Sequence, residues 1–427
     1  MSTNELYEKF LKSSGVVTDS RKINKNSLFF SLKGPNFNGN HFAKSALENG
    51  ANFAVIDEKK YYDEKHNYIL VNDCLQSLQN LANFHRKKLD TKIIAITGSN
   101  GKTTTKELIY SVLKTKFNCI CTEGNLNNHI GVPLSLLKFS SDTEIGIIEM
   151  GANHLGEIKL LTKIAQPNYG YITNFGKAHL EGFGNEKGVI KGKSELYDFL
   201  KSSSGLIFFN SDDSTQKTIL CDYHNKFGFG QKDADLKYSV ISEDPIIKLK
   251  VKNTNIESSL FGNYNVQNII SAVSIGTYFG VDMQKIKSGI SNYISSNNRS
   301  QIIEKNNNKI FLDAYNANPT SMLLAIKYFE KYNLKNKILI IGDMYELGKE
   351  ENKFHQEIVD YCQSLKVEKV FLIGEIFSKT RFSKKFTSYL NYLELLQNRE
   401  FMKIKNCNIL IKGSRGIKLE KIVDFIS

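Results

Sequence analysis

Short, continuous apolar runs alternate with helical patterns through the middle of the chain. The clearest runs are Lys92–Ile96, Ile145–Glu149, Tyr169–Thr173 and Leu206–Asn210. Uninterrupted runs of this length are typical of strands buried on both faces of a parallel sheet. A helical pattern at Thr103–Leu113 follows the first run directly, and others separate the later runs. The alternation predicts a doubly wound α/β domain.

Two further α/β units flank this domain. In the first unit, apolar runs at Ser27–Leu32 and Asn52–Ile56 surround a helical stretch at His41–Asn49, and Leu75–Leu89 predicts an amphipathic helix that leads out of it. After the central runs come a more antiparallel pattern at Leu236–Leu260 and a helical one at Asn265–Phe279. The strands predicted for the last unit are Ile310–Asp313, Lys337–Ile341, Lys369–Ile373 and Asn408–Ile411.

The chain is therefore expected to belong to the α/β class and to fold as three domains. An N-terminal α/β domain is placed at residues 1–90 and a central doubly wound domain at residues 91–298. A smaller, Rossmann-like α/β domain is placed at residues 299–427. The length of 427 residues agrees with about three domains of ordinary size.

Composition narrows the functional classes. The net charge of +13 suits anionic substrates, but no dense basic run with interleaved aromatic residues indicates nucleic-acid binding. The 6 cysteines show neither a CxxC pair nor zinc-ligand spacing. The sequence has no apolar signal core at its start and no run near the ~18 apolar residues of a membrane span. We expect a reduced, cytoplasmic protein with no membrane span.

The strongest chemical motif is TGSNGKTT at Thr97–Thr104, between a predicted buried strand and a predicted helix. Gly98 and Gly101 would let backbone N–H groups approach a polyphosphate, and Lys102 would add a cation. The Thr103 hydroxyl suits Mg²⁺. The standard pattern has a glycine where Ile96 stands, so a plain strand–helix turn is the competing interpretation.

Three later positions suggest metal chemistry. Glu149 ends a predicted strand downstream of the phosphate loop, where a carboxylate suits Mg²⁺, although it could equally cap a helix. His179 stands in a Gly-rich loop, where a histidine is more often structural than a ligand. Lys193 could contribute to a metal site only if it were paired or changed its charge, and carbamylation by CO₂ would supply a carboxylate.

The last domain offers groups for polar recognition. Asp313 ends a predicted strand and could hold a ribose, while Asn316 and Asn318 could orient a ligand by hydrogen bonds. An ordinary Asn/Pro turn is the alternative for this NANP segment. Lys412 and Arg415, in the turn IKGSR, suit an anionic carboxylate or phosphate.

These motifs occur together and in an order that resembles the Mur ligase superfamily over essentially the whole chain. The resemblance implies an ATP site made by Gly98, Ser99, Asn100, Gly101, Lys102, Thr103, Thr104, Asn268, Arg299 and Asp313. Within this set, Asn268 in GNYNVQN is expected at the adenine, Arg299 at a phosphate and Asp313 at the ribose. It also implies metal ligands at Thr103, Glu149, His179 and a carbamylated Lys193, with Lys102, His179 and Lys193 as the catalytic residues.

Within the superfamily, four motifs resemble those of the branch that adds D-alanyl-D-alanine to a UDP-linked muramoyl tripeptide. They are AHLEGFG, YNANP, GDMYELG and KGSR. The substrate-binding residues implied are Ser20, Arg21, Asn127, Asn128, Tyr315, Asn316, Asn318, Lys412 and Arg415. Asn38 stands where the family often has Asp, and Asn40 lies near the place of a histidine, so the uridine contacts stay open. The acidic or Asp-Asn-Pro-Arg loop of the branch that adds the third residue is missing.

The resemblance implies an amide ligase of peptidoglycan precursor synthesis that forms an acyl phosphate and uses ATP and two Mg²⁺ sites. We expect a monomer whose last domain brings Arg299 and Asp313 to ATP on closure. A sister ligase with another amine substrate is the nearest alternative. A P-loop ATPase or kinase and a non-catalytic nucleotide-binding module are the others, and Glu149, His179 and Lys193 argue against the last.

Overall fold

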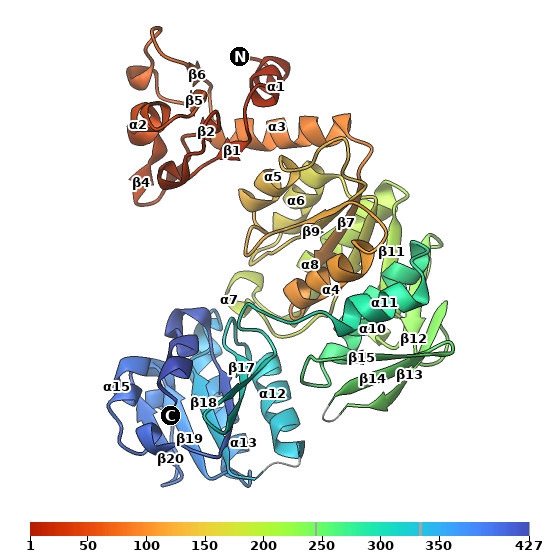
Figure 1. Cartoon of the computed structure of the whole chain (residues 1–427), viewed down its shortest axis with the longest axis vertical. Helices are drawn as coiled ribbons and strands as arrows, with labels where there is room; N and C mark the ends of the chain where they lie inside the picture. Colours follow the sequence, from red (N-terminus) through yellow and green to blue (C-terminus); the bar gives the residue numbers. More distant parts are fainter. Residues whose placement is uncertain (244–245, 333–334, 427) are drawn as a thin grey trace.

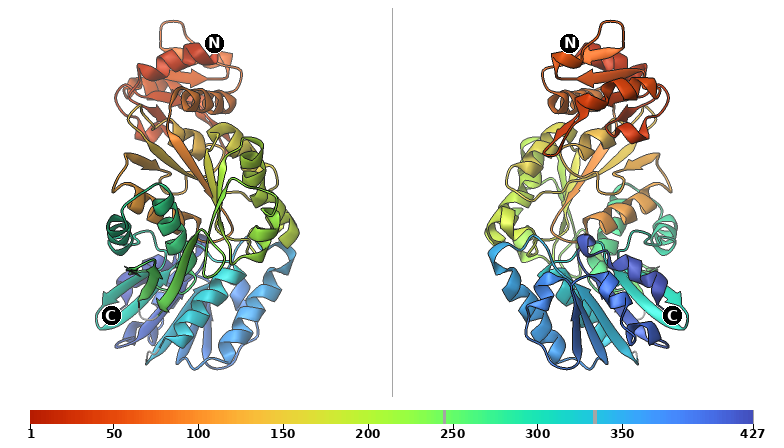
Figure 2. Two further views of the ribbon diagram at one scale, coloured as in Figure 1. Left: turned by 90° about the vertical axis from the view of Figure 1, so that its right-hand side faces the viewer. Right: turned by 90° about the vertical axis from the view of Figure 1, so that its left-hand side faces the viewer.

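The computed structural model describes residues 1–243, 246–332 and 335–426. Three α/β bodies follow one another along the long axis, with the N-terminal body at one end and the C-terminal body at the other (Figure 1). The side views show the same order (Figure 2). Within the described residues, these bodies are built on sheets of four, nine and six strands. No helix in this part of the chain is long and apolar enough to cross a membrane.

The N-terminal sheet is small and parallel, with strand order β1-β2-β5-β6. The first helix begins at a capping box, in which the Ser2 hydroxyl accepts from the Glu5 N–H and the Glu5 carboxylate accepts from the Ser2 N–H. The elements are α1 (Thr3–Leu11), β1 (Val16–Val17), η1 (Ser20–Lys22), β2 (Leu28–Phe30), β3 (Lys33–Gly34), β4 (Phe37–Asn38), η2 (Gly39–Phe42), α2 (Ala43–Glu48), β5 (Phe53–Ile56), η3 (Lys59–Tyr61), β6 (Tyr68–Leu70) and α3 (Cys74–Lys88).

The central sheet has the order β15-β14-β13-β12-β11-β10-β7-β9-β8, and it is parallel from β8 to β13. The four predicted apolar runs form β7, β9, β10 and β11. The predicted antiparallel stretch is confirmed by the pairing of β13, β14 and β15, and its residues 244–245 lie outside the described residues. The elements are β7 (Lys92–Thr97), α4 (Lys102–Leu113), β8 (Cys119–Cys121), α5 (Gly131–Leu136), β9 (Ile145–Glu149), α6 (Glu157–Ala165), β10 (Tyr169–Ile172), α7 (Leu180–Phe183), α8 (Glu186–Ser202), β11 (Leu206–Asn210), α9 (Ser214–Ile219), β12 (Lys226–Gly230), β13 (Leu236–Ser242), β14 (Ile247–Val251), β15 (Thr254–Ser258), α10 (Asn265–Tyr278) and α11 (Met283–Ser291).

The C-terminal sheet has the order β16-β17-β21-β18-β19-β20. All its pairs are parallel except the hairpin of β16 with β17, which the sequence did not predict. The elements are β16 (Gln301–Lys305), β17 (Asn308–Asp313), α12 (Pro319–Lys331), β18 (Lys337–Gly342), η4 (Gly348–Glu350), α13 (Glu351–Gln363), β19 (Lys369–Ile373), α14 (Glu375–Ser378), β20 (Phe386–Tyr389), α15 (Tyr392–Leu396), η5 (Phe401–Lys403), β21 (Asn408–Lys412), η6 (Arg415–Ile417) and η7 (Leu419–Phe425).

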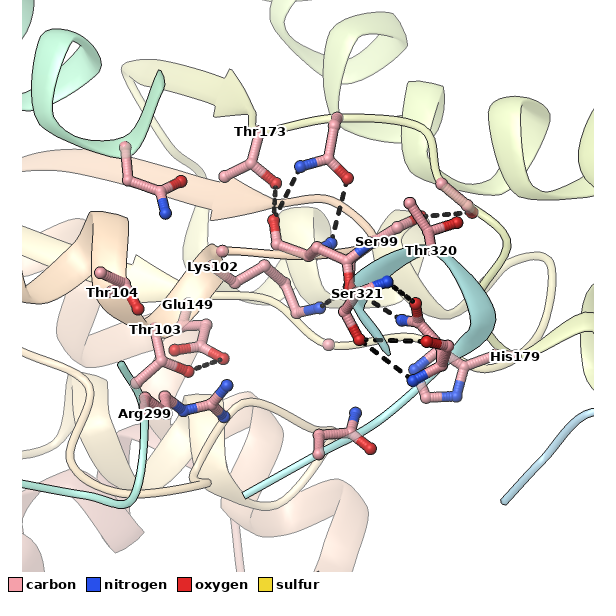
Figure 3. Close-up of a pocket in the computed structure, with 18 of the residues that line it drawn as sticks. Ser99, Lys102, Thr103, Thr104, Glu149, Thr173, His179, Arg299, Thr320 and Ser321 are labelled. Atoms are coloured by element: carbon pink, nitrogen blue, oxygen red, sulfur yellow. Dashed lines mark hydrogen bonds between the residues drawn. The ribbon is translucent and has the colours of Figure 1, made fainter. Parts of the chain in front are cut away.

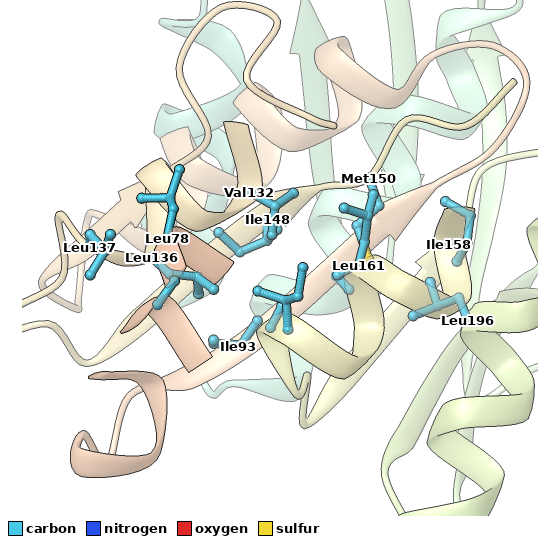
Figure 4. Packing of buried hydrophobic residues seen from close by; sticks show 14 of the residues in the cluster. Leu78, Ile93, Val132, Leu136, Leu137, Ile148, Met150, Ile158, Leu161 and Leu196 are labelled. Carbon is cyan, nitrogen blue, oxygen red and sulfur yellow. The ribbon is translucent and has the colours of Figure 1, made fainter. Parts of the chain in front are cut away.

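The apolar cores show how the bodies are joined. One face of the central sheet packs on α5, α6 and α8 in a cluster that continues through α3 into the N-terminal domain (Figure 4). Leu78 of α3 belongs to this cluster together with Ile93 and Leu136. The other face packs on α4, α10 and α11 in a separate cluster. The C-terminal sheet has a cluster on each face, and one of them includes Phe261, which precedes α10 in the central domain.

Candidate active site

The carboxyl ends of β7 and β9 open towards the C-terminal domain, as expected for a ligand site of a doubly wound sheet. A cavity of about 1080 Å³ lies there and is lined from both domains. Figure 3 shows part of its lining. The sequence-predicted residues in the lining are Ser99, Asn100, Gly101, Lys102, Thr103, Thr104, Asn127, Asn128, Glu149, His179, Asn268, Arg299, Asp313, Tyr315, Asn316, Asn318 and Lys412.

Glycine is required at two positions of the phosphate loop. Gly98 and Gly101 have φ angles of 140° and 79°, a region that L side chains rarely adopt. A Cβ on Gly101 would also lie 2.4 Å from Asn268 Oδ1, and one on Gly98 would lie 2.0 Å from Thr173 Oγ1. The loop can therefore pass close to its neighbours only because both residues lack side chains.

Bonds from the segment after β10 fix the loop from outside. The Asn100 N–H donates to Asn174 Oδ1 at 3.1 Å, and the Thr173 hydroxyl donates to the Asn100 carbonyl at 2.6 Å. The Ser99 hydroxyl donates to the Gly176 carbonyl at 2.9 Å. This support holds the loop in shape without a ligand, which lowers the entropy lost when a polyphosphate binds.

Lys102 lies folded back on its own loop. Its Nζ donates to the carbonyl oxygens of Gly98 and Ser99 at 2.7 and 3.2 Å. Burial lowers the pKa of Lys102 to about 8, with Glu149 opposing the shift and Arg299 adding to it. The ammonium is therefore still the main form at neutral pH, at the start of α4, where the helix dipole also favours anions.

The two carboxylate oxygens of Glu149 have different surroundings. Its Oε1 accepts from the Thr103 hydroxyl at 3.2 Å and from Asn127 Nδ2 at 2.8 Å. Its Oε2 is buried and has no hydrogen-bond partner among the described residues, although Lys106 Nζ lies 3.9 Å away. A buried carboxylate oxygen beside a hydroxyl and a phosphate loop has the donor chemistry that Mg²⁺ prefers. The pair therefore fits the predicted metal site.

Lys193 does not line the cavity but lies directly behind it. Its side chain is fully buried, and its Nζ donates to the Ala152 carbonyl at 2.8 Å and lies 5.0 Å from the centre of the Phe183 ring. Burial, reinforced by the charge of Lys102, holds the pKa of Lys193 well below its ordinary value. The neutral amine is the form that reacts with CO₂, so this environment suits the predicted carbamylation.

His179 is contacted from the other domain. Its Nδ1 lies in close contact with the carboxylate of Glu346, which follows β18. A metal would therefore have to take Nε2 or displace Glu346. No group of three or more His, Cys, Asp and Glu side chains within the described residues has an arrangement that could hold a metal ion. Any metal here would need hydroxyl, phosphate or modified-lysine oxygens as well.

The C-terminal residues form two contact groups at the cavity wall. Asp313 pairs with the buried Lys412 at 2.5 Å. The guanidinium carbon of Arg299 lies 3.7 Å from the centre of the Tyr315 ring, and Arg415, outside the lining, donates to the Tyr315 hydroxyl at 3.2 Å. Two cations, Arg299 and Lys412, therefore lie at this wall, with Arg415 held next to it through Tyr315, a charge distribution that suits a polyphosphate.

The two domains also touch directly at the phosphate loop. Asn318 Nδ2 donates to Asn100 Oδ1 at 2.7 Å, while Asn318 Oδ1 caps α12 by accepting from the Ser321 N–H. The NANP segment therefore caps a helix, which agrees with its interpretation as an Asn/Pro turn, and it also forms a contact between the two domains. The predicted Arg299 and Asp313 already face the cavity in this arrangement.

Other predicted residues have different surroundings. Asn268 uses Oδ1 to accept from the Thr105 hydroxyl and Nδ2 to donate to Asn265 Oδ1, so its amide is already oriented by the protein. Asn128 Oδ1 accepts two N–H groups at the start of α5. Ser20 and Arg21 lie in η1 of the N-terminal domain and are not part of the cavity.

Sequence reasoning missed several residues of the site. Thr173 and Asn174 support the phosphate loop, and Glu346 contacts His179 from the C-terminal domain. Lys106 lies between two carboxylates one turn into α4. The motif GDMYELG, which contains Glu346, was one available signal. The charged run Lys106-Glu107 on a helix that is otherwise buried was another, because a buried charge is costly unless it is paired.

A nucleotide-type phosphate loop, an acidic residue at the end of β9 and a second α/β domain over the cavity define a class of ATP-using enzymes. Family models describe each part of the chain: "Mur ligase family, catalytic domain" matches residues 12–86, "Mur ligase middle domain" residues 96–276 and "Mur ligase, glutamate ligase domain" residues 298–403. The chain belongs to the Mur ligase family.

The relatives of this chain indicate which branch of the family it resembles. The chain is 36% identical to the UDP-N-acetylmuramoyl-tripeptide--D-alanyl-D-alanine ligase of Bacillus subtilis (strain 168), over 96% of this chain and 92% of that protein. It resembles a crystal structure of MurF from Acinetobacter baumannii with a TM-score of 0.86 and 27% identity, over 100% and 98% of the two chains. MurF from Thermotoga maritima in complex with ADP matches with a TM-score of 0.84 and 25% identity, over 98% and 97%.

Proposed function

We propose that this chain is an ATP-dependent ligase that joins D-alanyl-D-alanine to UDP-N-acetylmuramoyl tripeptide in peptidoglycan precursor synthesis. The observation that carries the chemistry is the shared cavity of Lys102, Glu149 and Arg299, which is lined by a phosphate loop, by a carboxylate that accepts from the Thr103 hydroxyl, and by a cation from the next domain. The substrates follow from the relatives, whose names specify this tripeptide and dipeptide over almost the full chain.

The first step is phosphoryl transfer. A terminal carboxylate oxygen of the tripeptide bonds to the γ-phosphorus of ATP, and the bond from that phosphorus to the β,γ-bridging oxygen breaks, giving ADP and an acyl phosphate. The reaction brings anions together, so positioning and charge neutralisation dominate its barrier. Lys102 and Arg299 are assigned to the γ-phosphate, because both cations face the cavity beside the loop.

The second step forms the amide. The amine nitrogen of D-alanyl-D-alanine bonds to the acyl carbon, loses a proton, and inorganic phosphate leaves. Asp313 is assigned to the ribose and Asn268 to the adenine. Tyr315, Asn316, Asn318, Lys412 and Arg415 of the C-terminal domain are assigned to substrate binding together with Asn127 and Asn128, and Ser20 and Arg21 to the UDP part.

Thr103 and Glu149 would hold one Mg²⁺, and His179 with a carbamylated Lys193 would hold a second. When bound, these ions supply positive charge that binds the phosphates and brings the attacking carboxylate to them. The chain itself provides the Glu149 carboxylate and the buried Lys193 amine, whose pKa burial lowers. The unprotonated amine would bond to CO₂ and lose a proton to become the carbamate. We also propose that the enzyme acts as a monomer in the cytoplasm, where ATP and UDP-linked precursors are available.

The deciding measurement is phosphate release with ATP, Mg²⁺ and UDP-muramoyl tripeptide, with and without D-alanyl-D-alanine, alongside the mass of the product. We expect release that depends on the dipeptide and a UDP-muramoyl pentapeptide product. A product formed only with another amine would make the chain a sister ligase. ATP hydrolysis indifferent to both substrates would make it an ATPase, and ATP binding without turnover would make it a binding module.

A further inference from the structure

The linker at residues 292–300 connects α11 to the C-terminal domain and carries Arg299 into the cavity. The two neighbours of Arg299 adopt left-handed backbone conformations, with φ angles of 57° at Asn298 and 47° at Ser300. Such conformations persist where the surroundings impose them. Arg299 Nε is buried and has no hydrogen-bond partner among the residues that the structure describes. The linker therefore holds a cation ready for a ligand.

Glu107 binds this linker from the phosphate-loop helix. It lies on α4, one turn after Thr103, and is half-buried. Its Oε2 accepts from the Tyr293 hydroxyl at 2.5 Å, and its Oε1 accepts from Asn297 Nδ2 at 2.8 Å. Burial and the charge of Glu107 raise the pKa of Tyr293, so its hydroxyl remains a donor. Both bonds are charge-assisted, the stronger class of protein hydrogen bond.

Lys106 connects Glu107 to the predicted metal site. Its Nζ lies 3.8 Å from Glu107 Oε1 and 3.9 Å from Glu149 Oε2, and the side chain is buried. It also donates to the Thr122 carbonyl at 2.6 Å, while the Thr122 hydroxyl accepts from the Glu149 N–H at 3.0 Å. A buried ammonium that shares two carboxylates and a carbonyl is held in one place.

A second chain of hydrogen bonds reaches the other side of Arg299. The Thr105 hydroxyl donates to Asn268, Asn268 donates to Asn265, and Asn265 Nδ2 donates to Ser300 Oγ at 3.0 Å. Three consecutive residues of α4 thus take part in fixing the linker or the carboxylate of Glu149. The helix that begins at the phosphate loop is connected to the linker on both sides of Arg299.

We propose that Glu107 is a positioning residue: it fixes the linker that carries Arg299 relative to the phosphate loop, and Lys106 ties Glu107 to Glu149. The inference rests on the proposed ligase function, in which Arg299 meets the γ-phosphate. Glu107 itself does not line the cavity. Its loss should therefore lower kcat, because displacing a catalytic group by about 1 Å can reduce the rate up to about a hundredfold. The binding of nucleotide to the phosphate loop should be unaffected.

The test compares Glu107→Gln and Tyr293→Phe with the double variant. Each single change should lower kcat about tenfold and leave the Kd for ADP and the KM for tripeptide within about twofold. Because both changes remove the same hydrogen bond, the double variant should have nearly the same kcat as Glu107→Gln alone. The matched control is a second Tyr–Glu pair, in which the Tyr361 hydroxyl donates to Glu330 at 2.8 Å outside the cavity. Glu330→Gln and Tyr361→Phe should leave kcat unchanged.

Hydrogen exchange of the ligand-free full chain gives a readout that needs no ligase activity. Glu107→Gln and Tyr293→Phe should each speed exchange of the linker amides at residues 292–300, with other regions unchanged and Tm preserved. Unchanged linker exchange, or a raised KM for ATP at constant kcat, would overturn the proposal. A wild-type chain without amide synthesis would refute the ligase function instead, and linker exchange alone would then decide whether Glu107 fixes the linker.

Discussion

The phosphate loop and the turn at η1 differ in how firmly they hold their functional side chains. Lys102 bonds to two carbonyl oxygens of a loop that is itself fixed by Thr173 and Asn174. The Arg21 side chain is 86% exposed and, among the residues that the structure describes, pairs within its own turn, with Asp19 at 2.9 Å. The region proposed for bond making is built before any ligand arrives, whereas the region proposed for the UDP part is open. Mutations in the two regions should therefore change different kinetic constants.

The largest effect is expected at the phosphate loop. Lys102→Ala should lower kcat by about a thousandfold, since it removes a preorganised cation from the transferring phosphate. The fold should survive, because the lost bonds are to the loop's own carbonyls. Lys116→Ala is the control, as Lys116 also donates to two carbonyls, of Phe279 and Gly280, but outside the cavity. Steady-state kinetics with circular dichroism would check this, and normal turnover of Lys102→Ala would exclude the assignment.

Lys193→Ala is expected to cost at least about a hundredfold, because it removes the proposed carbamate. Small carboxylic acids should restore part of the activity of this variant, and none to Lys102→Ala. Degassed, CO₂-depleted buffer should also slow the wild-type enzyme. Full activity of Lys193→Ala in such buffer would show that no carbamate is needed.

A smaller and different effect is expected at the N-terminal turn. Arg21→Ala should raise the KM for UDP-muramoyl tripeptide about tenfold, because one charge-assisted hydrogen bond contributes a binding free energy of about that size. The kcat and the KM for ATP should be unchanged. Lys22→Ala, on the same exposed turn, is the matched control. If Arg21→Ala lowered kcat instead, the contrast between an open recognition region and a prebuilt reaction region would be wrong.

The smallest effect concerns pH. Burial lowers the pKa of His85 on α3, whose ring contacts the Tyr7 hydroxyl at 3.3 Å and the Phe139 carbonyl at 2.9 Å. Below the ordinary pKa of about 6.5, the unfolded chain takes up a proton that the folded chain resists, so stability falls as the solution becomes acidic. Between pH 7.5 and 5.5 the loss from this one group should be at most about 1.4 kcal/mol. Urea unfolding of His85→Gln should show a shallower pH dependence than wild type.

The sequence predicted the elements and residues whose signal is local. The strands β7 and β9 are uninterrupted apolar runs, and the phosphate loop is one contiguous motif. By contrast, Asn100 meets Asn318 from 218 residues away, and Glu346 meets His179 across the domain boundary. Such contacts depend on how finished domains pack, which no local pattern encodes. The edge strand β16 was missed because half-exposed positions interrupt its apolar pattern.

The helix α3 has a consequence for how the chain could be divided. It packs on α1 on one side and on α5 and α6 on the other, so its apolar residues belong to both domains at once. Arg86 adds bonds to the Ala165 and Gln166 carbonyls of the central domain. A fragment that began at β7 would leave the apolar faces of α5 and α6 uncovered and prone to association. The N-terminal and central domains thus share one helix and one apolar cluster, so we expect neither to fold well when they are separated at β7.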